Sequence, residues 1–129
     1  MRFLLDTHVV IWTWQEPSRV PEPIHDQLID RSNECIVSVA SVWELAIKYA
    51  AGKLKLPAPP AHWLPQALAH FQFALLDIAM AHALGAAGLP RIHGDPFDRM
   101  LIAQAQVEGL TLVTADPVFR QYGVNLHVI

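Results

Sequence analysis

Short, largely apolar segments alternate with longer amphipathic ones along this chain, and the pattern limits the folds open to it. The apolar segments are expected to be buried strands, at residues 3–5, 35–39, 71–76, 110–113 and 126–129. Strands that are apolar throughout, rather than at alternate positions, are typical of a parallel sheet covered on both faces. The pattern therefore predicts an α/β fold of three layers, α/β/α, with a mostly parallel central sheet of four to five strands.

Prolines, glycines and capping residues mark the expected helices. These are predicted at residues 9–14, 24–31, 41–51, 62–70, 77–87 and 95–108, with a short one beginning at Pro117. Gly52, Gly88 and Gly109 follow three of them as stop signals. Asp77 and Asp95 are interpreted as the N-caps of the helices that they begin.

Length and charge narrow the class of protein. The 129 residues suit a single domain, residues 1–129, and 53% are hydrophobic. The formal charge of -3 argues against a protein that holds nucleic acid mainly through a basic surface, but not against a nuclease whose phosphate partner is a bound cation. The single cysteine, Cys35, excludes an internal disulfide framework. Neither a signal peptide nor an apolar stretch of the ~20 residues that span a membrane is visible, so a cytoplasmic protein is expected.

Four acidic residues stand where strands end or the following helices begin. Asp6 follows the first strand, Glu44 lies in the helix after the second, Asp98 opens the helix of residues 95–108, and Asp116 follows the fourth strand. Ligands of open parallel sheets bind at the carboxyl ends of the strands, where these side chains can converge. Clustered carboxylates repel unless a cation such as Mg²⁺ lies between them. The chemistry that fits is metal-assisted phosphodiester hydrolysis.

Each of these acids also has an interpretation as a helix cap. Ser41 and Glu44 match a capping box, the helix dipole favours Asp98, and Asp116 stands at an N-cap position. Asp6 is open to the same interpretation. Capping and metal binding are compatible, because first-turn acids point toward the same edge of the sheet.

Four motifs occur in order along the whole chain: Phe3-Leu4-Leu5-Asp6-Thr7-His8, Ser41-Val42-Trp43-Glu44, His93-Gly94-Asp95-Pro96-Phe97-Asp98-Arg99 and Leu112-Val113-Thr114-Ala115-Asp116. Together they resemble the PIN-domain family, and more closely the VapC-type toxins of bacterial toxin–antitoxin pairs. The resemblance implies a PIN-like fold and a Mg²⁺- or Mn²⁺-dependent endoribonuclease. It also implies that Asp6, Glu44, Asp98 and Asp116 are the catalytic and metal-binding quartet.

The resemblance extends to further residues and to partners. Thr114 corresponds to the hydroxyl residue found beside the last acid, and Thr7 and Thr114 are candidate substrate contacts. Arg99 is a third candidate because it stands beside Asp98, where it either contacts a phosphate of the substrate or makes an ordinary salt bridge. The implied partners are an RNA substrate and a cognate antitoxin that covers the acidic site, and a homodimer is expected. Trp12 and Trp14 are two residues apart and cannot share one helix face, so one of them is a candidate for a partner-binding surface.

Other polar groups leave alternatives open. The seven histidines lack the spacing of a zinc site, and His93 is expected to shape the loop before Asp95. Lys48, Lys53 and Lys55 form a small basic cluster that either contacts RNA or is simply solvated. The competing functions are another metal-dependent phosphoryl hydrolase, either a DNA nuclease or a phosphatase, and a non-catalytic binding module.

Overall fold

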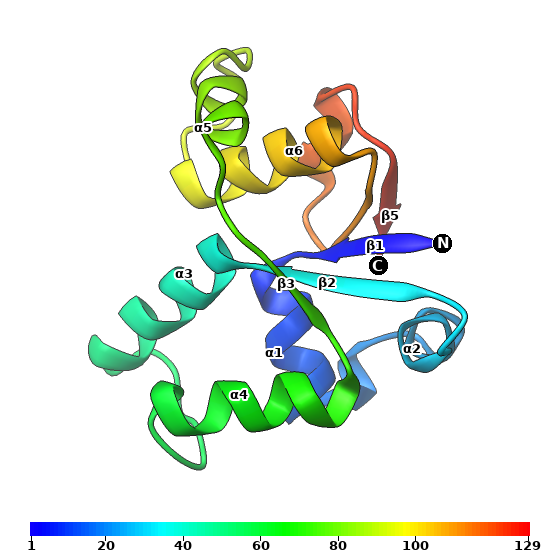
Figure 1. Cartoon of the computed structure of the whole chain (residues 1–129), viewed down its shortest axis with the longest axis vertical. Coiled ribbons are helices and arrows are strands. Elements are labelled where there is room, and N and C mark those ends of the chain that lie inside the picture. Colours follow the sequence, from blue (N-terminus) through cyan, green and yellow to red (C-terminus); the bar gives the residue numbers. More distant parts are fainter.

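A five-stranded, wholly parallel sheet forms the centre of the computed structural model, which describes residues 1–129 (Figure 1). Its strands are β1 (Arg2–Leu5), β2 (Glu34–Ser38), β3 (Ala74–Leu76), β4 (Thr111–Thr114) and β5 (Leu126–Val128). Their order is β3-β2-β1-β4-β5, and all four pairings are parallel. The chain thus leaves β1 in one direction for β2 and later returns to its other side for β4. That reversal is the switch point at which such sheets bind ligands.

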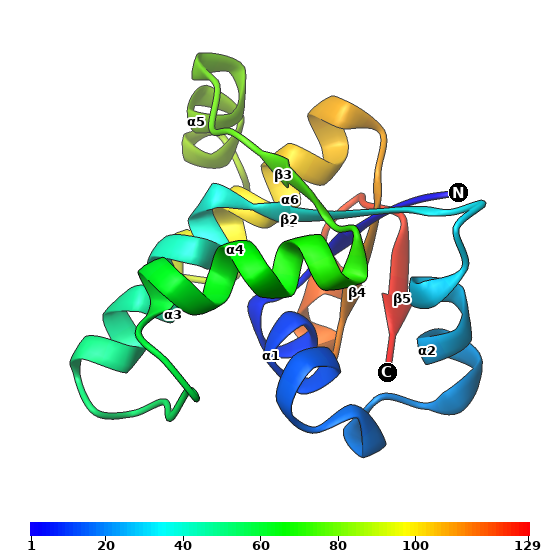
Figure 2. The ribbon, with the colours of Figure 1, turned by 60° about the horizontal axis from the view of Figure 1, so that its bottom comes forward.

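Helices cover both faces of the sheet, as the three-layer prediction requires (Figures 1 and 2). They are α1 (Thr7–Gln15), α2 (Glu22–Ile29), α3 (Val39–Ala50), α4 (Pro60–Phe71), α5 (Met80–Ala87) and α6 (Pro96–Glu108), with the short 3-10 helices η1 (Pro17–Arg19) and η2 (Pro117–Gln121). None of these helices is long and apolar enough to cross a membrane.

The strands are apolar throughout because their two faces belong to two cores. Phe3 and Leu5 of β1 pack in one core with side chains from α1 and α2, whereas Leu4 packs in the other with side chains from α6 and η2. All three side chains are at most 1% exposed. The predicted parallel sheet with two covered faces is therefore confirmed.

Two predicted boundaries around β3 are wrong. Phe71 does not begin a strand but ends α4, because Gln72 adopts a left-handed conformation (φ 56°) and the Phe73 amide bonds back to the Leu68 carbonyl. Asp77 is not an N-cap. Helix α5 begins three residues later, and its N-cap is Ala79, whose amide donates to Nδ1 of His82.

Candidate functional site

Asp6 lies at the carboxyl end of the central strand and forms the floor of the site. It occupies the N-cap position of α1, but its side chain makes no capping hydrogen bond. Instead, its Oδ2 accepts a hydrogen bond of 2.7 Å from the Thr114 hydroxyl at the end of β4. Asp6 is only 5% exposed. The sequence left open whether Asp6 caps α1, and the structure excludes that interpretation.

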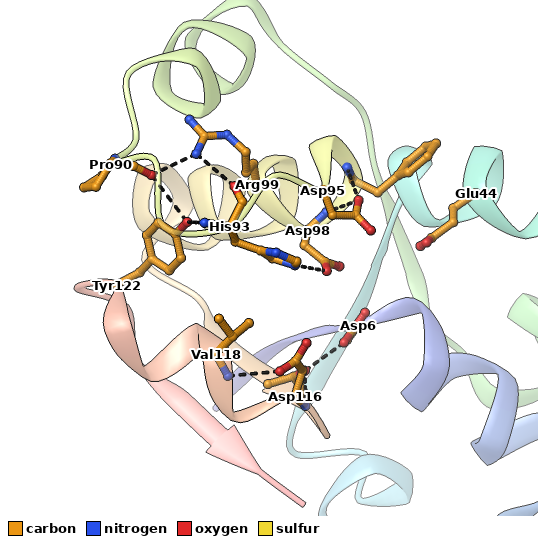
Figure 3. Close-up of polar contacts among 12 residues, drawn as sticks. Asp6, Glu44, Pro90, His93, Asp95, Asp98, Arg99, Asp116, Val118 and Tyr122 are labelled. Carbon is orange, nitrogen blue, oxygen red and sulfur yellow. Dashed lines mark hydrogen bonds and ion pairs between the residues drawn. The ribbon is translucent and has the colours of Figure 1, made fainter.

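Thr114 also fixes the position of Asp116. Its Oγ1 accepts from the Asp116 amide at 3.1 Å, and the Asp116 carboxylate accepts from the Val118 amide at 3.0 Å. Asp116 is thus the N-cap of η2, as expected. Figure 3 shows that this cap faces the same space as Asp6. Capping leaves the remaining oxygen of the Asp116 carboxylate available to a ligand.

The start of α6 brings Asp98 to the site from the other side. Asp95 is the N-cap of α6, as predicted, and its Oδ1 accepts from the amides of Phe97 and Asp98 at 2.8 and 3.3 Å. Asp98 follows in the first turn. Its Oδ2 lies 2.7 Å from Nε2 of His93, which fixes the direction of the carboxylate (Figure 3).

Glu44 approaches from α3. The N-cap of α3 is Ser38, whose hydroxyl accepts from the Ala40 amide, so the predicted capping box of Ser41 and Glu44 is wrong. Oε2 of Glu44 lies 3.4 Å from Nζ of Lys48 one turn later. Its Oε1 is buried and has no hydrogen-bond partner. A buried carboxylate oxygen without a partner is costly, so this oxygen is suited to a ligand.

The four acids line one open pocket of about 490 Å³, together with His8, Trp12, Lys48, Asp95, Ala115 and Pro117. Burial raises the pKa of Asp6 above its usual range, against the effect of the Thr114 hydrogen bond. Burial, with the nearby charge of Asp6, raises the pKa of Asp98 to about 7. In both cases burial is the main cause, and the charge of a neighbouring carboxylate adds to it.

The donor set fits a hard divalent cation. Carboxylate oxygens are the ligands that Mg²⁺ and Mn²⁺ prefer. Ligand atoms of His93, Asp98 and Asp116 lie within 4.8 Å of one another, close enough to share one ion. That trio includes His93 and omits Asp6 and Glu44, which face the same pocket. Because the His93 ring is hydrogen-bonded to Asp98, we assign His93 the role of orienting that carboxylate.

Comparison with known proteins identifies the family of the chain. The model of the PIN domain matches residues 3–125. This chain belongs to the PIN-domain family. A relative, ribonuclease VapC22 of Mycobacterium tuberculosis, is 34% identical over 120 residues, which cover 92% of this chain and 90% of the relative. Ribonuclease VapC16 of the same organism is 38% identical over 53 residues, 41% of this chain and 38% of that relative.

Solved PIN-domain structures share the fold of the whole chain. VapBC2 from Rickettsia felis, bound to a DNA fragment from its promoter, matches with a TM-score of 0.72 at 20% identity and covers 99% of this chain and 98% of that one. DNA-bound VapBC from Salmonella typhimurium matches with a TM-score of 0.70 at 23% identity and the same two coverages. At 20% and 23% identity, these structural matches show that the fold is shared and say nothing about function.

Arg99, Thr7 and Thr114, the three expected substrate contacts, are hydrogen-bonded to other groups of the protein. The Arg99 guanidinium donates to the carbonyl oxygens of residues 86, 89, 90 and 93, at 2.8 to 3.3 Å, and so holds the segment before α6. The Thr7 hydroxyl is buried and donates to Ser41, and that of Thr114 donates to Asp6. These contacts give Arg99, Thr7 and Thr114 positioning roles, and their contact with substrate stays a prediction.

His93 is the site residue that sequence reasoning assigned only to the shape of its loop. Its backbone amide donates a hydrogen bond of 2.8 Å to the Tyr122 hydroxyl, while its ring is hydrogen-bonded to Asp98. The available signal was the spacing in the PIN-domain motif, where His93 precedes Asp98 by five residues. A loop residue held at both its backbone and its ring is well suited to orient a neighbouring carboxylate.

Proposed function

We propose that this protein is a metal-dependent endoribonuclease that acts as the toxin of a toxin–antitoxin pair. The observation that carries the proposal is the convergence of Asp6, Glu44, Asp98 and Asp116 in one pocket at the carboxyl edge of the sheet. Membership of the PIN-domain family and 34% identity to ribonuclease VapC22 support RNA as the substrate.

Mg²⁺ or Mn²⁺, held by Asp6, Glu44, Asp98 and Asp116, would lower the pKa of a bound water and stabilise the charge that develops on the phosphate. The protein's own contribution is to keep the carboxylates in position. Thr114 holds Asp6 and Asp116, whereas His93 and the cap at Asp95 hold Asp98. Such supporting contacts typically change metal affinity or activity by 10- to 100-fold.

The proposal includes a protein partner. Similar structures include a complex of VapBC2 and a toxin–antitoxin complex from Klebsiella pneumoniae. We infer a cognate antitoxin for this chain, which would cover the acidic pocket, and a homodimer of the chain itself. An RNA substrate would place the protein in the cytoplasm.

The test is cleavage of a mixed RNA pool and of matched single-stranded DNA by the purified protein, with Mg²⁺, with Mn²⁺ and with chelator. We expect RNA to be cut only with metal, and Asp6→Asn or Asp98→Asn to lower the rate by at least 100-fold. Asp77→Asn is the matched control, because Asp77 is an exposed acid outside the pocket. Full activity in both pocket variants would refute the assignment, and preferential cutting of DNA would favour a DNA nuclease.

A further inference from the structure

A second, more apolar groove adjoins the acidic pocket. It has a volume of about 390 Å³ and is lined by Glu44, Ile47, Lys48, Ala51, Lys53, Asp95, Pro96 and Phe97. Glu44, Lys48 and Asp95 line the acidic pocket as well, so the two hollows are continuous. Figure 3 shows Glu44 on α3 and Asp95 at the start of α6, the two elements between which the groove lies.

An aromatic pair, the exposed Trp43 and the half-buried Phe97, stands beside this groove. Trp43 on α3 is 62% exposed, and its ring meets that of Phe97 edge-to-face, with centroids 5.3 Å apart. Ile47, one turn after Trp43, is 44% exposed. The two rings are not stacked, and Trp43 keeps most of its surface exposed. Trp43 and Ile47 together form an exposed apolar patch on α3, and such patches beside pockets are typical of surfaces that contact another molecule.

The charges of the groove indicate what that molecule is. Lys48 is the only lysine or arginine that lines the acidic pocket, and its Nζ is paired with Glu44. Lys53 is exposed, and none of the salt bridges of the protein involves it. A protein with a net charge of -3 thus places two cations and an aromatic pair directly beside its most acidic feature.

We propose that this groove holds a nucleotide of single-stranded RNA that flanks the cleaved phosphate, with the base stacked on Trp43 and the phosphate bound by Lys53. The inference rests on the proposed function and adds the path of the substrate. Base stacking on aromatic side chains combined with cationic backbone contacts is the usual way in which single strands are held. Lys53, the lysine of the groove that has no salt bridge, is the group that favours an anionic strand as the occupant.

The test is binding of a 12-nucleotide, unstructured, fluorescein-labelled RNA, followed by anisotropy as a function of salt. All variants carry Asp98→Asn and are measured with Mg²⁺, so that the RNA stays intact. Trp43→Ala should weaken binding at least fivefold at every salt concentration, because stacking is lost. Lys53→Gln should lower the slope of log K against log salt by about 0.7, the value for one phosphate contact of a single strand.

Matched controls separate the groove from the rest of the surface. Met80→Ala removes a side chain that is 78% exposed on α5, and Arg31→Gln removes an exposed cation outside both hollows. Both should leave affinity and slope unchanged. If Trp43→Ala behaves like Met80→Ala, or Lys53→Gln keeps the full slope, the proposal is wrong.

Further readouts distinguish RNA from a second copy of the chain as the occupant of the groove. They also distinguish failure of the groove proposal from failure of the proposed nuclease function. Sedimentation velocity that shows loss of a dimer in Trp43→Ala, with RNA affinity unchanged, would assign the face to a second copy and overturn the RNA groove. RNA cleavage by proteins that carry Trp43→Ala or Lys53→Gln at the unaltered rate would overturn the groove alone. If Trp43→Ala and Lys53→Gln weaken RNA binding but the unmodified protein cleaves no RNA, the groove proposal stands and the proposed nuclease function is wrong.

Discussion

At the scale of single residues, the Thr114 hydroxyl connects two of the four acids. It donates to Asp6 and accepts from the amide of Asp116, and Thr114 has no exposed surface. A valine of the same shape would leave the buried Asp6 carboxylate without this donor. We expect Thr114→Val to lower RNA cleavage by 10- to 100-fold through weaker metal binding, and to cost about 1–3 kcal/mol of stability.

Cleavage rates at several Mg²⁺ concentrations and urea unfolding test this prediction. Thr114→Ser is the control, because serine keeps the hydroxyl and should retain most of the activity. Equal activity in Thr114→Val and the unmodified protein would show that Asp6 needs no such donor.

The crowded carboxylates also predict how pH affects the metal-free protein. The pKa of Asp98 is raised from 3.8 to about 7 by burial and by Asp6, so between these values the folded state keeps a proton that the unfolded state loses. The free energy of unfolding should therefore fall as pH rises through this range, by up to about 1.4 kcal/mol per pH unit from this group. Asp98→Asn should be more stable than the unmodified protein at pH 8 with chelator, and the difference should vanish near pH 4.

Urea unfolding with chelator at pH 4, 6 and 8 measures this difference directly. Asp77→Asn, which removes an exposed acid outside the pocket, should show no such pH-dependent gain. If Asp98→Asn is less stable than the unmodified protein at pH 8, the hydrogen bond between Asp98 and His93 outweighs the cost of burying a charged Asp98 beside Asp6.

The candidate site could be predicted from the sequence because its acids follow strands or open helices, where a parallel sheet collects them. The contacts that hold those acids could not. Arg99 was expected at a phosphate, yet it binds backbone carbonyls of residues 86–93, and nothing in the local sequence shows where those carbonyls point. Likewise, the bond between Thr114 and Asp6 joins residues 108 positions apart.

At the scale of secondary-structure elements, Arg99 ties α5 and the following loop to α6. Its guanidinium donates to carbonyls at the end of α5, at Ala86, and in the loop, at Leu89, Pro90 and His93. Arg99→Met keeps much of the aliphatic stem but leaves these carbonyls without their donor. We expect a loss of about 2 kcal/mol in unfolding free energy and a smaller loss of activity, because the loop also carries His93.

Urea unfolding and hydrogen exchange check this prediction, and the loss of protection should be confined to α5 and the loop up to α6. Arg91→Met is the matched control, because Arg91 lies exposed in the same loop. If both variants unfold alike, the guanidinium contacts contribute little to stability.

Element types were easier to predict than element boundaries. The helix of residues 95–108 was predicted within one residue of α6, because Asp95 caps it and Gly109 ends it in a left-handed conformation (φ 66°). Around β3, by contrast, the largely apolar residues 71–76 suit a strand and a helix end equally well. In the structure the left-handed Gln72 separates the end of α4 from β3. A glutamine in the sequence does not indicate such a conformation.

At the scale of the whole molecule, the parallel sheet explains why acids from distant parts of the chain meet. β1 and β4 are adjacent in the sheet although more than 100 residues separate them, and their carboxyl ends carry Asp6 and Asp116. The two helices that follow β2 and precede β4 bring Glu44 and Asp98 to the same edge. The fold thus gathers four acids at one site, and we expect a cation to offset their charge.

A metal ion bound at this edge should therefore stabilise the entire fold. The unfolded chain disperses the four acids, so the ion binds only the folded state and raises the free energy of unfolding by about 1.4 kcal/mol at ten times its Kd. For a chain of this size that corresponds to a rise in Tm of about 3–6 °C. Calorimetry with Mg²⁺, with Mn²⁺ and with chelator measures it, and Asp98→Asn should reduce the shift while Asp77→Asn keeps it. A Tm that is unchanged by either metal, in protein free of antitoxin, would contradict the metal site and favour a domain that works by binding alone.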